Sequence, residues 1–237
     1  MKESSGEGRF RVTTIATGEP WNENCYLVFD REGRDQAVVD PGGQSELICA
    51  TAEAAAVPVA AILLTHAHHD HVRAAAKVAR HFGVSCHIHS ADFPLLRKAP
   101  SYSIAFGGKP FPPVVDPVPI EMPGRLTFSN GAMHILHTPG HTPGSCCFLF
   151  PGFALTGDTL LNRKIGRTDL PGCSREALIA SVDRLLESAA DDDLLYAGHR
   201  EPWRVKDARQ WWSEARENAP ALDVFEPESL RGGLSQS

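Results

Sequence analysis

The chain has 237 residues, of which 42% are hydrophobic and 22% are charged, so it is not a disordered, collagen-like or coiled-coil protein. Its net charge of −6 and the lack of any Lys/Arg block argue against a nucleic-acid-binding protein. The longest apolar run, Ala52 to Leu64, contains Glu53 and Pro58 and is too short to span a bilayer, so we expect no membrane partner.

Short β-branched or aromatic runs alternate with helical patterns along the chain. Strands are predicted over residues 9–17, 25–30, 36–40, 60–64, 84–89, 125–128, 132–138, 145–150, 153–157 and 194–197. Helices are predicted over residues 45–56, 174–189 and 206–217. A further helix is predicted to begin at the histidine cluster that follows residue 64 and to end at residue 81. Strands dominate both halves and each half closes with helices, which predicts an α/β (α+β) fold, a four-layer αβ/βα sandwich.

Three segments do not fit this regular pattern. Residues 1–8 are polar and predict a loose N-terminus, and residues 219–237 predict a flexible tail, which leaves residues 9–218 as one domain. Residues 99–124 contain seven prolines and predict a long connector or flap.

Cysteine usage bears on the compartment. The six cysteines form no C-x-x-C pair, and Cys146 and Cys147 are adjacent in a predicted strand, which favours reduced thiols and small core residues. The N-terminus has no apolar segment of the kind found in signal peptides. We therefore expect a cytoplasmic protein.

The most informative segment is Thr-His-Ala-His-His-Asp-His, which begins directly after a buried strand and holds four of the eleven histidines. His66 and His68 are two residues apart and can face the same side of an extended turn. Asp70 and His71 can face a second point nearby as the helix starts, whereas His69 is expected to point away. Imidazole and carboxylate are ligands for zinc, iron and manganese, so the spacing predicts the beginning of two metal sites.

Three further residues lie just beyond predicted strands. His141 stands in Thr-Pro-Gly-His-Thr-Pro-Gly-Ser, where prolines and glycines fix the backbone around one imidazole. Asp158 follows the apolar run Phe-Ala-Leu, and His199 follows Leu-Leu-Tyr. Their shared position at strand ends predicts that they join the histidine cluster in one site.

The ordered set of these residues, preceded by Asp40 in Val-Val-Asp-Pro-Gly-Gly, resembles the metallo-β-lactamase superfamily. The motifs TPGHTPGS, TGDTLL and IGRTDLPG are similar to its glyoxalase II (hydroxyacylglutathione hydrolase) branch, in the short form without a C-terminal helical domain. The resemblance covers residues 10–200 and implies the sandwich fold of that superfamily.

The resemblance also implies roles for individual residues. The expected ligands are His66, His68 and His141 for a first metal, Asp70, His71 and His199 for a second, and Asp158 as a bridge between them. Asp40 would hold the metal-binding loop through hydrogen bonds. The chain departs from the family pattern in four places. Arg200 follows His199 where the family often has Gly, Arg73 or Ala74 stands where Gly is usual after the histidine cluster, and Cys173 stands where Gly is common. The helices that contact glutathione in the longer enzymes have no clear counterpart.

These assignments imply a hydrolase that uses two divalent metal ions, with zinc first and iron or manganese as alternatives. A hydroxide on the metals would attack a thioester such as S-D-lactoylglutathione, and the thiolate would leave without a strong general acid. Arg163, Lys164 and Arg167 are candidates to contact the substrate carboxylates, and a structural pair between Arg167 and Asp169 is the alternative. The expected partner is a small-molecule thioester, and the protein would act as a monomer or homodimer.

Three rival functions remain open. Persulfide dioxygenases share the fold and use a single iron, for which His66, His141 and Asp158 would be the ligands. Lactone hydrolases of the same superfamily are a second alternative. A non-catalytic, metal-stabilised interaction module is the third, although no expected ligand is missing from the chain.

Overall fold

The computed structural model describes residues 2–4, 10–17, 22–30, 32–122, 124–128 and 131–217. Its helices are α1 (Ser45–Ala54), α2 (His69–Val72), α3 (Ala75–Phe82), the short 3-10 helix η1 (Ser90–Asp92), α4 (Phe93–Ala105), α5 (Arg175–Ser188) and α6 (Val205–Glu217). The strands are β1 (Lys2–Ser4), β2 (Phe10–Ala16), β3 (Asn24–Asp30), β4 (Gln36–Val39), β5 (Val59–Leu63), β6 (Cys86–His89), β7 (Val118–Ile120), β8 (Gly124–Phe128), β9 (Gly131–His137), β10 (Cys146–Phe150), β11 (Phe153–Gly157), β12 (Leu160–Leu161), β13 (Lys164–Ile165), β14 (Leu194–Ala197) and β15 (Trp203–Arg204).

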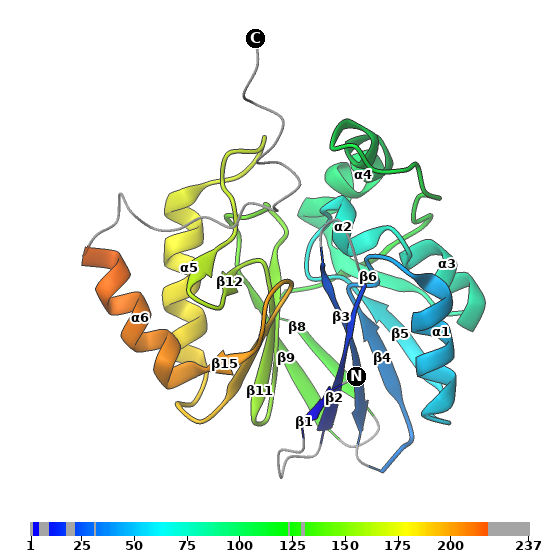
Figure 1. Ribbon diagram of the computed structural model, residues 1–237, viewed down its shortest axis with the longest axis horizontal. Coiled ribbons are helices and arrows are strands. Elements are labelled where there is room, and N and C mark those ends of the chain that lie inside the picture. The colour runs from blue at the N-terminus through cyan, green and yellow to red at the C-terminus, as the bar shows by residue number, and fades with distance from the viewer. Residues whose placement is uncertain are drawn as a thin grey trace.

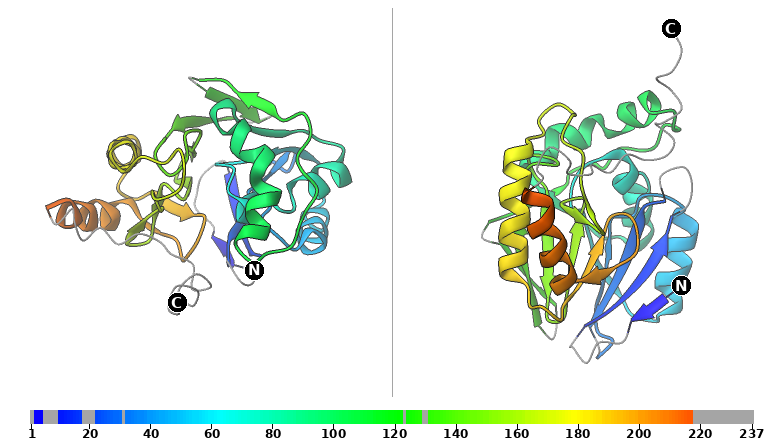
Figure 2. Two further views of the ribbon diagram at one scale, coloured as in Figure 1. Left: turned by 90° about the horizontal axis from the view of Figure 1, so that it is seen from above. Right: turned by 60° about the vertical axis from the view of Figure 1, so that its left-hand side comes forward.

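The strands form two large sheets that pack face to face (Figure 1). The first sheet has seven strands in the order β1-β2-β3-β4-β5-β6-β7, and the second has six in the order β15-β14-β11-β10-β9-β8. Helices α1 and α3 cover the outer face of the first sheet, and α5 and α6 cover that of the second (Figures 1 and 2). The predicted four-layer αβ/βα sandwich is therefore confirmed.

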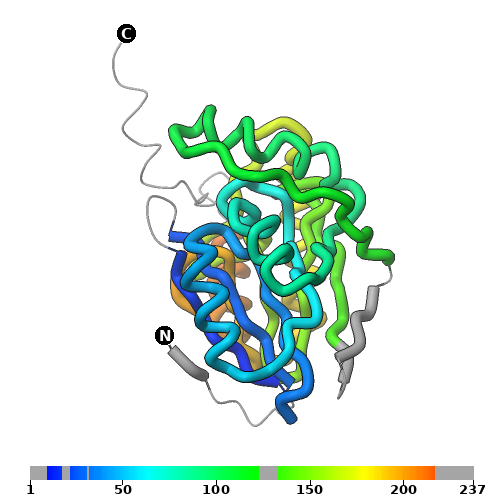
Figure 3. Tube along the Cα trace, turned by 90° about the vertical axis from the view of Figure 1, so that its right-hand side faces the viewer, coloured from blue at the N-terminus to red at the C-terminus, as the bar shows by residue number. Residues whose placement is uncertain are grey.

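Three apolar clusters hold the layers together. The central cluster lies between the sheets and includes Val28, Val39, Phe148 and Leu155, all at most 1% exposed. The second cluster joins the first sheet to α1 and α3, which are the helices nearest the viewer in Figure 3. The third joins the second sheet to α5 and α6, and Trp203 and Trp212 belong to it, so these tryptophans pack the core.

Parallel strand pairs decide where the loops meet. Strand β4 runs parallel to β5 in the first sheet, and β11 runs parallel to β14 in the second. Parallel neighbours end at the same edge of a sheet, so the loops after these four strands gather at one edge of the sandwich.

Local signals set several element ends where the sequence predicts them. The Ser174 hydroxyl accepts a hydrogen bond from the Ala177 N–H at 3.2 Å and caps α5. Helix α3 ends at Gly83, which adopts a left-handed conformation with φ of 68°.

The prediction for residues 99–124 is wrong in its first part, because residues 93–105 form helix α4. Pro94 lies in the first turn, where a missing N–H costs no hydrogen bond. Pro100 lies inside the helix and disfavours it, but Leu96, Ala99 and Ser103 are buried beneath it. Tertiary packing therefore outweighs the local signal of the proline.

The ends of the chain are described only in part. Residues 2–4 of the expected loose N-terminus form β1 and pair with β2, while residue 1 and residues 5–9 lie outside the described residues. The predicted tail 219–237 also lies outside them. None of the helices in the described ranges has the length and apolar character that a membrane crossing requires.

Candidate metal centre

The predicted ligands come together at the edge where the parallel strands end. His66 and His68 follow β5, Asp158 follows β11, and His199 follows β14. His141 lies in the loop after β9, which is tied to the first sheet because the Cys146 N–H donates to the Thr65 carbonyl at 2.8 Å. Loops from both sheets thus build one site.

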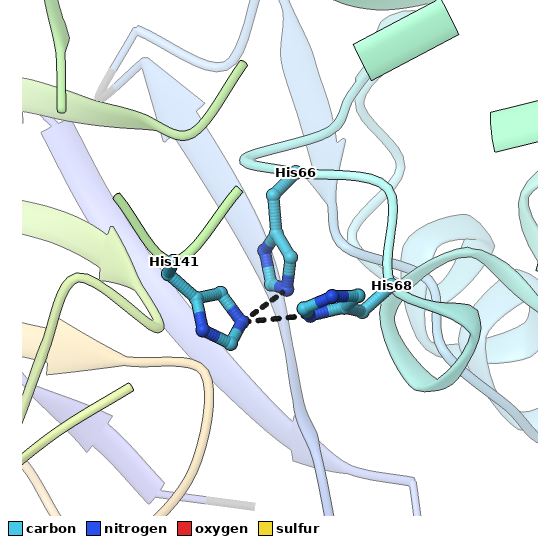
Figure 4. Close-up of side chains that lie close together, drawn as sticks. All are labelled: His66, His68 and His141. Carbon is cyan, nitrogen blue, oxygen red and sulfur yellow. Dashed lines mark hydrogen bonds between the residues drawn. The ribbon is translucent and has the colours of Figure 1, made fainter. Parts of the chain in front are cut away.

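Three imidazoles form the first cluster, and Figure 4 shows their ring nitrogens converging on one point. His66 and His68 come from the loop after β5, and His141 comes from the opposite side. The Nε2 atom of His141 lies 3.2 Å from His66 Nε2 and 2.7 Å from His68 Nδ1. Three lone pairs that face each other at these distances form a ready ligand set for a metal ion.

Asp70, His71 and His199 form the second cluster, and all three are buried. The Oδ2 atom of Asp70 lies 3.3 Å from His199 Nε2 and 3.9 Å from His71 Nε2. Two imidazoles and one carboxylate suit the same divalent metals.

The carboxylate of Asp158 lies between the two clusters. Its Oδ2 atom is 3.5 Å from His141 Nε2 and 3.7 Å from His199 Nε2, and its Oδ1 atom is 3.5 Å from His71 Nε2. One carboxylate therefore reaches ligand atoms of both clusters, as the sequence prediction requires of a bridge.

The residues present fit a pair of bound cations. Within the described part of the chain, His71 Nε2 and Asp158 Oδ1 are buried and have no hydrogen-bond partner. Buried polar atoms are nearly always paired, so two such atoms 3.5 Å apart suit a bound cation as their shared partner.

Hydrogen bonds on the outer side of the rings fix which nitrogen faces the site. His71 donates from Nδ1 to Asp40 Oδ2 at 3.1 Å, and His141 donates from Nδ1 to the Arg167 carbonyl at 2.9 Å. Both rings therefore turn their Nε2 atom to the interior. Asp40 also accepts from the Thr65 N–H at 2.8 Å and from its hydroxyl at 2.6 Å, so it holds the start of the ligand loop.

The pKa directions divide the histidines into two groups. Burial, reinforced by neighbouring imidazoles, lowers the pKa of His66 and His68 well below the ordinary value, and burial also lowers the pKa of His141. Burial acts in the same direction on His71, but the carboxylates of Asp158, Asp70 and Asp40 outweigh it and raise the pKa of His71 well above that value. The first cluster is thus neutral and ready to bind, whereas His71 must lose a proton.

Two glycines permit the close approach of these loops. A Cβ atom at Gly198 would overlap with Asp158 Oδ1 and His71 Cε1. A Cβ atom at Gly166 would overlap with the Asp158 carbonyl and the His141 ring. Any larger residue at either position would displace a ligand.

Asp92 belongs to the surroundings of the first cluster, and the sequence analysis missed it. It is fully buried at the end of η1, and its carboxylate accepts from the Ala67 N–H at 2.9 Å, the Thr142 hydroxyl at 2.8 Å and the Gly144 N–H at 2.7 Å. Ala67 stands between His66 and His68, and Thr142 follows His141. Asp92 therefore joins the two loops of the first cluster, although burial raises the pKa of its carboxyl against these three bonds.

His69 does not point outward as predicted. It is 7% exposed, and its ring stacks on Phe106 at the end of α4, with ring centres 5.4 Å apart and planes 8° apart. Because α4 lies over α2 (Figure 1), the space that an outward ring would enter is filled. His69 is not a member of either ligand cluster, but it lines the same cavity as the ligands.

That cavity lies above the ligand atoms and opens to solvent. Its described lining includes the predicted ligands His68, Asp70, His141, Asp158 and His199 on one side. The other side is formed by Leu95, Tyr102 and Phe106 from α4 and the residue after it, and by Leu170 and Pro171. A substrate can therefore reach both clusters from one opening.

Of the three residues predicted to contact the substrate, the structure places one at the cavity. Arg167 lines the cavity, and its Nε and Nη2 atoms both donate to the Asp169 carboxylate at 2.7 Å, which is the structural pair given as the alternative. Arg163 and Lys164 are not among the described residues that line the cavity. Both belong to the β12–β13 hairpin, where Arg163 is exposed at the turn with φ of 58°.

Two of the departures from the family pattern have local consequences. Arg200 adopts a left-handed backbone with φ of 73°, a conformation that glycine takes without strain. The Cys173 thiol donates to the His141 carbonyl at 2.9 Å, so it supports the loop of a ligand. All six cysteines are free thiols, and Cys146 and Cys147 are buried core residues as predicted.

Comparison with known proteins adds the family. The sequence model of the metallo-beta-lactamase superfamily matches residues 18–199. Hydroxyacylglutathione hydrolase GloC of Haemophilus influenzae is 35% identical over 183 residues, which cover 76% of this chain and 86% of that protein.

Two solved structures are similar along most of their length. TTHA1623, solved in a di-iron-bound form, is 35% identical and superposes with a TM-score of 0.75 over 83% of this chain and 97% of its own. BLEG-1, a B3 metallo-beta-lactamase, is 27% identical with the same TM-score over 84% of this chain and 96% of its own.

Proposed function

Because the chain belongs to the metallo-β-lactamase superfamily, whose fold implies divalent metal ions, we propose that it is a dinuclear metal-dependent hydrolase that cleaves thioesters. The similarity to GloC of Haemophilus influenzae supports the hydroxyacylglutathione hydrolase branch, with S-D-lactoylglutathione as the first substrate to test.

The position of Asp158 carries this proposal. A carboxylate within 3.5–3.7 Å of His141, His71 and His199 is suited to hold two cations close together. A site for a single iron needs only His66, His141 and Asp158, and it gives no reason to bury the complete second cluster. The di-iron form of TTHA1623 supports double occupancy in a relative.

The proposed ligands divide as the clusters do. His66, His68 and His141 would hold the first metal, Asp70, His71 and His199 the second, and Asp158 would touch both. When bound, the metals would lower the pKa of water to about 7 and polarise a carbonyl group.

The remaining work falls to the chain itself. Asp40 and the Arg167 carbonyl hold the Nδ1 protons of His71 and His141, which keeps both Nε2 atoms turned toward the cavity. Leu95 and Tyr102 of α4 line the cavity and present apolar surface to a bound substrate. A thiolate is a good leaving group, so no acid beyond the solvent is needed to complete the reaction.

We further propose zinc as the resident metal, with iron or manganese as alternatives, since imidazole and carboxylate accept all three. Free thiols throughout the described chain support a reducing compartment such as the cytoplasm. We keep as predictions that the partner is a small molecule, that the protein binds neither nucleic acid nor membrane, and that it is a monomer or a homodimer.

The test is a pair of assays on wild type and His199→Ala with the metal content measured in both. Release of thiol from S-D-lactoylglutathione reports hydrolysis, and oxygen uptake with glutathione persulfide reports dioxygenation. We expect thioester cleavage by the wild type, a severe loss in His199→Ala, and partial retention of the first metal. His81→Ala, which changes a half-exposed histidine on α3 outside the cavity, is the matched control.

Oxygen uptake that survives His199→Ala, with no thioester cleavage in either protein, would replace the hydrolase by a mononuclear iron enzyme. Cleavage of lactones in place of thioesters would keep the metal centre and change the substrate class.

A further inference from the structure

The wall of the cavity opposite the metal ligands is apolar. Leu95, Tyr102, Phe106 and Leu170 are half-buried, and each lines the cavity together with the exposed Pro171. Half-buried apolar side chains that face a common hollow are covered when an apolar group enters it. The wall therefore favours a ligand with apolar surface.

Phe106 belongs to this wall and is held in place by its neighbours. Its ring stacks on His69 with centres 5.4 Å apart, and on Tyr102 with centres 6.4 Å apart and planes 20° apart. The Arg167 guanidinium lies 5.9 Å from the same ring. Aromatic groups fixed by such contacts present a rigid surface, so little ordering cost remains for the ligand to offset.

The few charged side chains of the cavity also favour an apolar ligand. Arg167 is the single cationic side chain among the described residues that line the cavity, and Asp169 engages it with two hydrogen bonds of 2.7 Å. Arg163 and Lys164 lie outside the lining. A carboxylate placed here would compete with Asp169 for one guanidinium, whereas an apolar group needs no countercharge.

We infer that the cavity receives the acyl group of its substrate, and that this group is apolar or aromatic and packs against Phe106 and Tyr102. The inference rests on the proposed thioester hydrolysis and, within that reaction, ranks apolar acyl groups above the hydroxyacyl group of S-D-lactoylglutathione. The carrier thiol would then extend toward the opening, where bulk solvent can hydrate its polar groups. Phe106 becomes a specificity-determining residue.

The experiment compares acyl groups on one uncharged carrier. Phenylacetyl, hexanoyl and lactoyl thioesters of N-acetylcysteamine are assayed with the metal-loaded wild type, and each kcat/KM is divided by the rate of alkaline hydrolysis of the same compound. This division removes intrinsic reactivity, so the remaining difference reports the pocket. We expect the phenylacetyl and hexanoyl thioesters to exceed the lactoyl thioester by about tenfold or more.

Phe106→Ala should lower the phenylacetyl value by about tenfold while changing the lactoyl value only about twofold. Phe106→Leu keeps most of the bulk, and it serves if the alanine variant fails to fold. Ile104→Ala is the matched control, because Ile104 lies two residues before Phe106 in the last turn of α4, is 57% exposed and does not line the cavity. Metal content and unfolding temperature are measured for every variant.

The possible outcomes distinguish a wrong acyl-group inference from a wrong hydrolase proposal. Thioester cleavage with the lactoyl group preferred, or with equal losses for all acyl groups in Phe106→Ala, would overturn the inference and leave the hydrolase intact. Failure of the fully metal-loaded wild type to cleave any of these thioesters, and S-D-lactoylglutathione as well, would overturn both.

Discussion

Replacement of Asp92 by Asn tests whether the first cluster is held together from outside. Asparagine has the volume of aspartate, but one carboxylate oxygen becomes an NH2 group. If the amide keeps its oxygen toward Ala67 and Thr142, the NH2 group faces the Gly144 N–H, and two donors oppose each other. The change therefore breaks one of three bonds and weakens the other two.

The expected cost follows from these contacts. A hydrogen bond to a charged group contributes roughly 1.5–3 kcal/mol, and a buried donor left without an acceptor costs about 1–3 kcal/mol. We expect Asp92→Asn to lower the free energy of unfolding by about 2–4 kcal/mol. Because Ala67 separates His66 from His68 and Thr142 adjoins His141, the first metal should bind about 10–100-fold more weakly.

The assay is a competition of the protein with a chelator for Co²⁺, followed by its absorption spectrum, beside urea unfolding of the metal-free protein. Asp30→Asn is the matched control, since Asp30 is also fully buried but lies at the end of β3 remote from the loop of His199. A loss of stability in both variants with unchanged metal affinity in Asp92→Asn would refute the reasoning.

Three further predictions concern the same edge of the sandwich. Asp158→Ala removes the carboxylate that approaches both clusters. Bound metal should therefore fall well below two ions per chain, and the rate of hydrolysis should fall by several orders of magnitude. A near-normal metal content by elemental analysis would contradict this prediction. His69→Ala should keep both metals, because His69 belongs to neither cluster, yet lower kcat/KM for apolar thioesters about tenfold through the loss of the Phe106 stack; a loss of metal would show that His69 is a ligand. On acidification from pH 7.5 the second metal should leave first, because the raised pKa of His71 lets protons compete there while the lowered pKa values of His66 and His68 keep the first cluster neutral; metal content after dialysis at stepwise lower pH measures the order.

The ligand loops could be predicted from the sequence because each one follows a short apolar strand directly. His66, Asp158 and His199 all stand within a few residues of such a strand, and parallel pairing then brings the strand ends to one edge. The local sequence pattern and the tertiary arrangement agree at these positions, so a motif next to a predicted strand was enough to predict that these loops lie together.

Residues that act through tertiary contacts left no such signal. Asp92 is a single acidic residue, and its three hydrogen-bond donors come from two loops that are distant in the sequence. The helix that precedes Phe106 contains Pro100, which argues against a helix when only the sequence is considered. Arg163 and Lys164 were expected near the substrate because they are close to Asp158 in sequence, but the β12–β13 hairpin places them outside the cavity. Closeness in sequence to Asp158 therefore does not predict which residues of a following hairpin face the cavity.

The pairing of loops from opposite sheets also sets the order of assembly during synthesis. The Asn24 N–H donates to the Gly198 carbonyl at 2.7 Å, so the strand near the N-terminus meets the loop of His199 only after almost all of the described chain has emerged. The first sheet can form earlier from its own residues, yet it carries neither complete cluster, since His141, Asp158 and His199 all come later. Nascent chains and truncated fragments would therefore bind metal poorly, and acquisition of the full metal complement would report that both sheets have closed on each other.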